Sequence, residues 1–120
     1  DKSKRPEMGK ISAKFADVII LTAEDSRSEN VFNIMDQVAQ GFPQAFKLTD
    51  ASFYQASQEK VYFRIPERRE AIKFAVSIAE PGDVLLLTGK GHEKSLNVNG
   101  HELQWDEAKI ALESVHEKTV

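Results

Sequence analysis

The sequence predicts an α/β fold: a three-layer, Rossmann-like arrangement with a mostly parallel sheet, helices on both faces and a C-terminal β-hairpin. Residues 18–21 and 84–87 are apolar runs without a polar face, which is typical of central strands in a parallel sheet. Amphipathic helical patterns alternate with these runs along the chain. The dipeptide Asn99-Gly100, between two short segments, is typical of a tight hairpin turn.

In the first half of the chain, two helices surround the strand at 18–21. The first helix begins near Pro6, and its predicted apolar face is formed by Met8, Ile11 and Phe15. The second begins at a capping box formed by Ser26 and Glu29. Its predicted apolar face is formed by Val31, Ile34, Met35, Val38 and Phe42. Residues 44–60 are mixed and polar, and only a short strand at 46–48 is predicted there.

The second half continues the alternation. We expect a strand at 61–65, a helix from Pro66, a turn at 81–83 and a fully buried strand at 84–88. A hairpin at 95–104 precedes a last helix capped by Asp106, with Trp105 as a core residue. The predicted core faces of these two helices are Ile72, Ala75, Val76 and Ala79, and then Ala108, Ala111, Leu112 and Val115.

Composition narrows the classes of function. The 120 residues suit one domain, and 41% hydrophobic with 29% charged residues is ordinary for a folded soluble chain. A net charge of -3 with interspersed signs argues against nucleic-acid binding, and the apolar runs are too short to span a membrane. The chain has no cysteine and no signal-peptide pattern, so we expect a cytoplasmic location.

The chain opens on a polar loop that leads directly into a helix. A βα fold normally begins with a strand before such a loop. We therefore expect the first strand, and further domains, to lie upstream of residue 1.

Two loops carry the candidate site, because ligands of open parallel sheets bind beyond the carboxyl ends of the strands. In residues 22–27, Arg27 suits a carboxylate ligand or balances the neighbouring acidic residues, and Asp25 suits a ligand ammonium or complements the helix N-terminus. In residues 89–94, glycines flank Lys90 and allow close backbone approach to a ligand. Glu93 suits an ammonium group.

Other chemistries are not supported by the spacing of the residues. The 89–94 loop lacks the spacing and the following Ser or Thr of a phosphate-binding P-loop. None of the three histidines has a partner at i+4, and the side chains of His92 and Glu93 diverge, so no metal site is predicted.

Four segments together resemble the C-terminal domain of the Mur ligase family. Residues 1–9 (DKSKRPEMG) resemble the family's DKGKRPxMG, and residues 22–27 occupy the place of its DNPR motif. Residues 89–93 match its GKGHE loop residue for residue. Residues 66–72 resemble its PDRxxAI helix start.

This resemblance implies that residues 1–120 form the amino-acid-binding domain of a three-domain ligase. The implied reaction is ATP-dependent, with Mg²⁺, and joins a third amino acid to UDP-N-acetylmuramoyl-L-alanyl-D-glutamate in peptidoglycan synthesis. The implied partners are the amino acid, the UDP-linked muramoyl peptide, and the N-terminal and central domains. The central domain binds most of the nucleotide and metal, so this domain alone is expected to be inactive.

The resemblance also assigns roles to residues. It implies that Arg27 binds the distal carboxylate of the incoming amino acid, and that Gly89 and Glu93 contact its distal end. Asp1 and Lys4 are implied to lie in a loop near the substrate and nucleotide side. The complete set expected to bind the amino acid is Asp25, Arg27, Gly89, Lys90, His92 and Glu93.

Two departures from the family pattern bear on specificity. Asp25 replaces the asparagine of the DNPR motif and Ser26 replaces its proline. The retained Arg27 favours meso-diaminopimelate over lysine, because lysine has no distal carboxylate. Asp25, however, adds negative charge where a carboxylate should arrive, and loss of the proline loosens the turn. Lysine or an unusual diamino acid therefore remains an alternative substrate.

Rival interpretations are a Rossmann-like nucleotide- or anion-binding module, a folylpolyglutamate synthase-like ligase or another Mur ligase that adds a different residue, and a non-catalytic relative that has lost its substrate. The first would need a glycine-rich loop after the first strand, and residues 22–27 contain no glycine.

Overall fold

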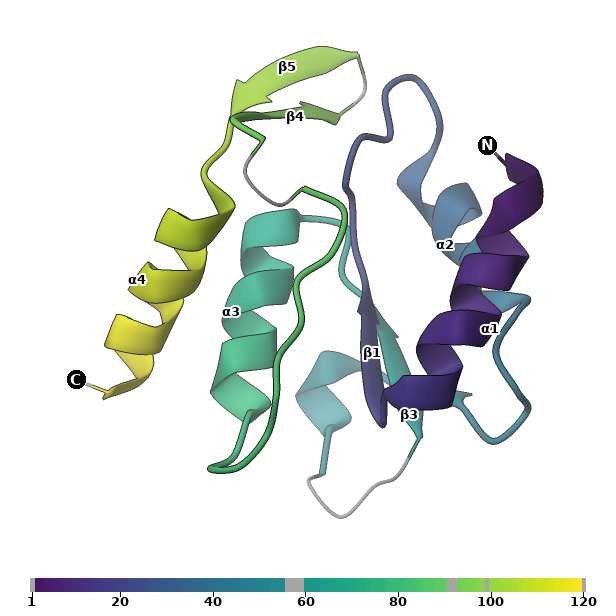
Figure 1. Cartoon of the computed structure of the whole chain (residues 1–120), viewed down its shortest axis with the longest axis horizontal. Helices are drawn as coiled ribbons and strands as arrows, with labels where there is room; N and C mark the ends of the chain where they lie inside the picture. Colours follow the sequence, from purple (N-terminus) through teal and green to yellow (C-terminus); the bar gives the residue numbers. More distant parts are fainter. Residues whose placement is uncertain (1, 56–59, 91–92, 99, 120) are drawn as a thin grey trace.

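The computed structural model describes residues 2–55, 60–90, 93–98 and 100–119 and confirms the α/β fold class (Figure 1). Its helices and strands follow the order η1 (Lys2–Lys4), α1 (Arg5–Phe15), β1 (Val18–Leu21), α2 (Val31–Ala39), β2 (Lys47–Leu48), η2 (Ala51–Phe53), β3 (Val61–Arg64), α3 (Arg68–Ile78), β4 (Ser95–Val98), β5 (His101–Gln104) and α4 (Glu107–Thr119).

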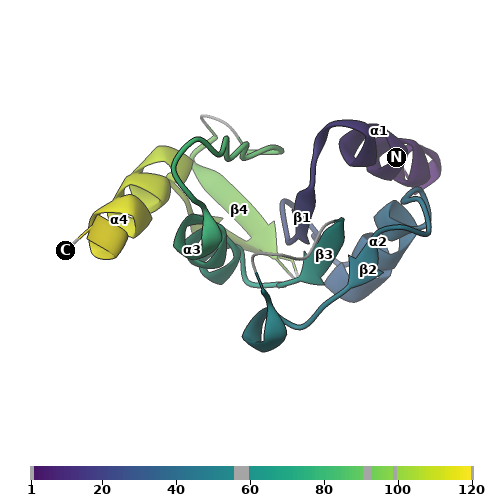
Figure 2. The ribbon, with the colours of Figure 1, turned by 90° about the horizontal axis from the view of Figure 1, so that it is seen from below.

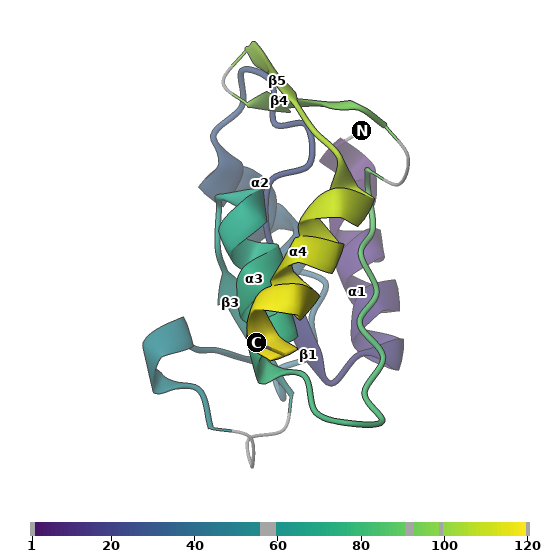
Figure 3. The same cartoon turned by 90° about the vertical axis from the view of Figure 1, so that its left-hand side faces the viewer.

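The three strands β1, β2 and β3 form a parallel sheet in the order β1-β3-β2. Val61 of β3 is paired with Val18 on one side and with Lys47 on the other. The sheet lies between the α1–α2 pair and the α3–α4 pair (Figure 2). Because the strands are parallel, their carboxyl ends meet at one edge, and the β4–β5 hairpin lies at that end of the molecule (Figures 1 and 3).

A hydrophobic cluster attaches the hairpin to the helices. Its buried members are Ile72 of α3, Leu96 of β4, Trp105 and Ile110 of α4. Trp105 is thus a core residue, as predicted. The predicted face of α3 is also confirmed, since Ile72, Ala75 and Val76 are buried.

The predicted face of α1 is wrong, and that of α4 is confirmed only at Ala111, which packs against the hydrophobic cluster. Helix α1 buries Gly9 and Ala13 against α2, and a Cβ atom on Gly9 would lie 1.9 Å from the carbonyl oxygen of Val38. The helices therefore meet through small residues, which leaves Met8, Ile11 and Phe15 exposed. In α4 a charged residue occupies the inner face: Glu107, Ile110 and Ser114 are buried, whereas Leu112 and Val115 are exposed.

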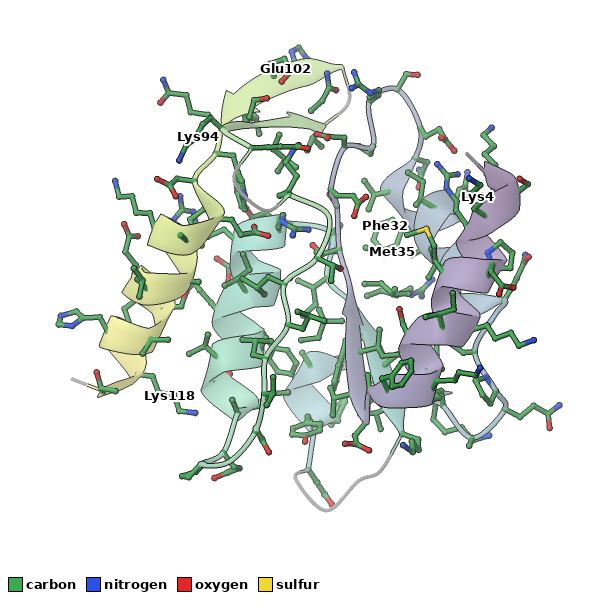
Figure 4. The ribbon with its side chains drawn as sticks, in the orientation of Figure 1. Lys4, Phe32, Met35, Lys94, Glu102 and Lys118 are labelled. Carbon is green, nitrogen blue, oxygen red and sulfur yellow. The ribbon has the colours of Figure 1, made fainter. Side chains whose placement is uncertain are left out.

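The predicted capping box is also wrong. Asn30, not Ser26, caps α2, and its side-chain oxygen accepts hydrogen bonds from the backbone N–H groups of Phe32 and Asn33. Glu29 binds Arg5 instead, at 2.8 Å. The predicted α2 face agrees better with the structure, since Met35 (Figure 4) is buried and the other four residues of that face are partly buried.

The segment 84–88 is not the buried strand that its sequence predicts. Val84 is 92% exposed and Leu86 is 78% exposed, and no strand is assigned there. Among the described residues, β1 pairs with β3 on one edge and with no strand on its other edge. An apolar segment needs a hydrogen-bonded neighbour to become a central strand, and within the described ranges this segment pairs with no strand.

Candidate functional site

The loop after β1 and the segment before the hairpin meet at the carboxyl edge of the sheet. The backbone N–H of Arg27 donates to the carbonyl oxygen of Asn97 on β4 at 3.3 Å, and Arg27 forms an isolated bridge with Val98. In return, the backbone N–H of Asn97 donates to the Asp25 carboxylate at 2.8 Å. The hairpin therefore holds the 22–27 turn, in which Ser26 replaces proline.

Lys90 binds two other predicted site residues, Asp25 and Glu93. Its Nζ atom lies 2.9 and 3.1 Å from the two carboxylate oxygens of Asp25 and 2.7 Å from Oε2 of Glu93. The Lys90 side chain is 1% exposed, whereas those of Asp25 and Glu93 are 31% and 53% exposed. The cation is therefore committed to protein carboxylates, and the two acidic side chains face outward from it.

The titration of this pair reflects two opposed influences. Desolvation is the largest influence on Asp25 and acts to raise its pKa, but hydrogen bonds from the Asn97 backbone and from Lys90 bring the pKa below its ordinary value. Desolvation likewise acts to lower the pKa of Lys90, and hydrogen bonds to Glu93 and Asp25 bring it above its ordinary value. Both groups are therefore held in their charged forms.

The lowered pKa of Asp25 predicts a pH-dependent stability. A carboxyl group whose pKa is lower in the folded state stabilises the fold above its unfolded value of 3.8, and this contribution disappears as the pH falls through the folded value. In urea unfolding at about pH 5.5 and about pH 3, the free energy of unfolding should fall less for Asp25→Asn than for the unmodified chain. Parallel losses in the two proteins would contradict the assignment, because the remaining carboxyl groups are common to both.

Arg27 is the exposed cation of the site. Its backbone has a φ of 54°, a left-handed value that costs energy for a side chain other than glycine. Among the described residues, no hydrogen bond or ion pair engages its guanidinium. The charge nevertheless acts on Asp25 and Glu102, where it favours the carboxylate forms.

Gly89 begins the second loop with a φ of 100°, as its predicted role requires. A Cβ atom at this position would lie 2.0 Å from Oε2 of Glu24. Two features therefore select glycine here: the left-handed backbone and the close approach of the first loop.

Of the remaining predicted site residues, the structure describes only Lys4. Asp1 and His92 lie outside the described residues. Lys4 is exposed at the N-terminal end of α1 (Figure 4), and no hydrogen bond or ion pair to the two loops is present in the described part of the chain.

Four polar residues of the site region were missed by reasoning from the sequence: Arg68, Asn97, Glu102 and Glu107. Asn97 donates its side-chain amide to Glu102, and this hydrogen bond is the largest cause of the lowered pKa of Glu102. Arg68 lies in a segment that resembles the family pattern, but an arginine in the first turn of a helix gives no sign of burial. The hairpin residues gave no signal, because their spacing predicts only a turn.

Taken together, the exposed groups suit a zwitterionic ligand. The guanidinium of Arg27, which has no partner among the described residues, can donate two parallel hydrogen bonds to a carboxylate. Glu93 on the second loop and Glu102 on β5 (Figure 4) present carboxylates that can bind an ammonium group. The site thus offers both signs of charge to one ligand.

Two other classes of site find no support in the described ranges. They contain no group of three or more acidic, histidine or cysteine side chains that could hold a metal ion. None of their helices is long and apolar enough to cross a membrane.

Comparison with known proteins identifies relatives over the whole chain. A diaminopimelate ligase (UDP-N-acetylmuramoyl-L-alanyl-D-glutamate--2,6-diaminopimelate ligase) of Caldanaerobacter subterraneus is 39% identical over 98% of this chain and 22% of the relative. The enzyme of that name from Listeria monocytogenes is 40% identical over 94% of this chain and 21% of the relative. A UDP-N-acetylmuramyl-tripeptide synthetase of Treponema denticola is 36% identical over 92% of this chain and 19% of the relative.

A solved structure agrees with these relatives. The structure of a UDP-N-acetylmuramoyl-L-alanyl-D-glutamate--2,6-diaminopimelate ligase matches 100% of this chain and 22% of that protein, with a TM-score of 0.79 and 28% identity. The chain therefore spans about a fifth of the length of the relatives it matches. The family model of the Mur ligase, glutamate ligase domain, matches residues 1–91. This chain belongs to the Mur ligase family.

Proposed function

We propose that this chain is the C-terminal, amino-acid-binding domain of an ATP-dependent ligase that adds meso-diaminopimelate to UDP-N-acetylmuramoyl-L-alanyl-D-glutamate. The names of its relatives support this reaction. The observation that carries the choice of amino acid is the exposed guanidinium of Arg27, which has no partner among the described residues and lies in the same site as the carboxylates of Asp25 and Glu102, on which its charge acts. Diaminopimelate ends in a carboxylate and an ammonium group, and the side chains of Arg27 and Glu93 complement these charges.

In this proposal, Arg27 binds the distal carboxylate of the amino acid, while Glu93 and the backbone at Gly89 hold its distal amino group. Lysine has the amino group but no distal carboxylate, so it would leave Arg27 without a partner. Asp25 does not repel the incoming carboxylate, because Lys90 and the Asn97 backbone already neutralise and bind it. The departure of Asp25 from the family pattern is thereby reconciled with a diacid substrate.

The proposal assigns ATP and Mg²⁺ mainly to a central domain outside these 120 residues. The described residues offer no metal-binding group and the sequence has no P-loop, so no step of the reaction is assigned to the nucleotide here. Apolar side chains on α1 and on the 84–86 segment are exposed and supply surfaces for the remaining parts of such an enzyme, which would act in the cytoplasm.

Product analysis tests this proposal. The full-length enzyme, given ATP, Mg²⁺, the UDP-linked dipeptide and an equimolar mixture of diaminopimelate and lysine, should form a product whose mass contains diaminopimelate. The 120-residue chain alone should release no phosphate from ATP. A product that contains lysine would refute the substrate, and ATP turnover by the chain alone would refute the assignment of the nucleotide to another domain.

A further inference from the structure

A buried arginine joins the elements that carry the two site loops. Arg68, in the first turn of α3, is 5% exposed, and its guanidinium makes four hydrogen bonds. Nη1 donates to the carbonyl oxygen of Ala23 at 3.0 Å, and Nη2 donates to that of Thr88 at 2.7 Å. Ala23 lies two residues before Asp25, and Thr88 directly precedes Gly89. One side chain therefore fixes the start of both loops.

The same guanidinium is held by a carboxylate from a third part of the chain. Nε of Arg68 donates to Oε1 of Glu107 at 2.9 Å, and Nη2 donates to the other oxygen of this carboxylate. The indole N–H of Trp105 donates to Glu107 as well, at 2.9 Å. Since Trp105 belongs to the core cluster and follows the hairpin, Glu107 connects the arginine to the hairpin that supports Asp25 and Arg27.

Charge couples this network to the site. Desolvation, the largest influence, acts to raise the pKa of Glu107, but hydrogen bonds from Arg68 and Trp105 lower it overall, and the positive charge of Lys90 contributes in the same direction. The positive charge of Lys90 therefore acts both on Asp25 in the site and on Glu107 in the buried ion pair.

We infer that Arg68, held by Glu107, is a positioning residue for amino-acid binding: it sets the separation of the 22–27 and 89–93 loops and so the distance between Arg27 and Glu93. This inference rests on the proposed function. Arginine is required because a lysine ammonium is a single point donor, which cannot reach two carbonyl oxygens and a bidentate carboxylate with a fixed planar geometry. The residue acts through the loops and does not itself touch the substrate.

The test compares Michaelis constants in the full-length enzyme. Arg68→Lys should raise the KM for the amino acid about 10-fold or more, since a displacement of about 1 Å can cost on the order of 100-fold. The KM values for ATP and for the UDP-linked dipeptide should stay within about 2-fold, because those ligands are assigned to other domains. Glu107→Gln, which keeps the shape of the side chain, should raise the amino-acid KM in the same direction but less.

Arg69→Lys is the matched control. Arg69 is the next residue of α3, but it is half exposed and lies 3.7 Å from Glu113, so its substitution should change none of the three constants. A merely structural role would lower the fraction of active enzyme or raise all three KM values together, and either result overturns the inference.

The Arg27→Ala variant distinguishes a failure of the positioning role of Arg68 from a failure of the proposed function. If Arg27→Ala raises the amino-acid KM and neither Arg68→Lys nor Glu107→Gln does, the positioning role is wrong and the proposed function stands. If Arg27→Ala leaves the amino-acid KM unchanged, the proposed function fails, and the inference that rests on it fails too.

Discussion

Replacing Arg27 by alanine in the full-length enzyme should raise the KM for meso-diaminopimelate about 10- to 100-fold. Hydrogen bonds to a charged group are worth about 1.5–3 kcal/mol, and about 1.4 kcal/mol corresponds to a factor of ten. The guanidinium has no partner among the described residues, so its removal leaves no protein group unpaired. The loss should therefore appear in substrate binding and hardly in stability. Amino-acid-dependent phosphate release at varied diaminopimelate concentration measures it.

Lysine provides the substrate control for this variant. Because lysine has no distal carboxylate, Arg27→Ala should change the kinetics with lysine much less than those with diaminopimelate. An equal loss with both amino acids would mean that Arg27 acts on something other than the distal carboxylate. A reduced melting temperature of the variant would instead indicate a structural role.

The buried ion pair between Arg68 and Glu107 should contribute strongly to the stability of the fold. Arg68→Met should lower the free energy of unfolding of the chain by about 3–5 kcal/mol, because it leaves Glu107 buried without its cation. The side chains of Arg68 and Glu107 are only 5% and 6% exposed, so water cannot replace the lost partner. Urea unfolding of the 120-residue chain gives the difference directly.

Two further variants make this prediction specific. Arg69→Met, on the exposed side of the same helix, should change stability by no more than about 0.5 kcal/mol. The double variant Arg68→Met/Glu107→Met should be more stable than Arg68→Met alone, since it removes the unpaired charge along with its partner. Equal effects for Arg68→Met and Arg69→Met would show that the ion pair does not stabilise the fold.

Local patterns predicted the elements of the fold better than their faces. The strand at 18–21, the hairpin and the inner face of α3 follow directly from short-range periodicity. The faces of α1 and α4 do not, because α1 meets α2 through Gly9 and α4 turns a glutamate inward to Arg68. Both contacts join residues far apart in sequence, and hydrophobic periodicity contains no information about them.

The failure at 84–88 has a related cause. Periodicity indicates that a segment is suited to burial, but a strand forms only beside a partner that satisfies its backbone. In the described part of the chain this segment pairs with no strand, although one edge of β1 is unpaired, and Val84 and Leu86 remain exposed. The prediction depended on a neighbour that the local sequence cannot specify.

The sequence predicted Asp25, Lys90 and Glu93 as members of one candidate site, and the structure places them in contact, but the sequence did not predict how they pair. The order of the strands and the family motifs pointed to Asp25, Arg27, Gly89, Lys90 and Glu93. The sequence did not reveal that Lys90 pairs with Asp25, because this contact joins loops 65 residues apart. As a result, the Arg27 guanidinium has no ion-pair partner among the described residues. Because the Asp25 carboxylate is paired with Lys90, the exposed Arg27 can bind the distal carboxylate of a diacid even though the motif contains an aspartate.

The selectivity of the full-length enzyme for diaminopimelate over lysine tests the proposed roles of Arg27 and Glu93 most directly. Phosphate release by the full-length enzyme should be determined with meso-diaminopimelate and with L-lysine separately, at saturating ATP and UDP-linked dipeptide. The complementarity of Arg27 and Glu93 to a distal carboxylate and ammonium predicts a kcat/KM at least about 100-fold higher for diaminopimelate. Turnover with lysine and none with diaminopimelate would contradict it.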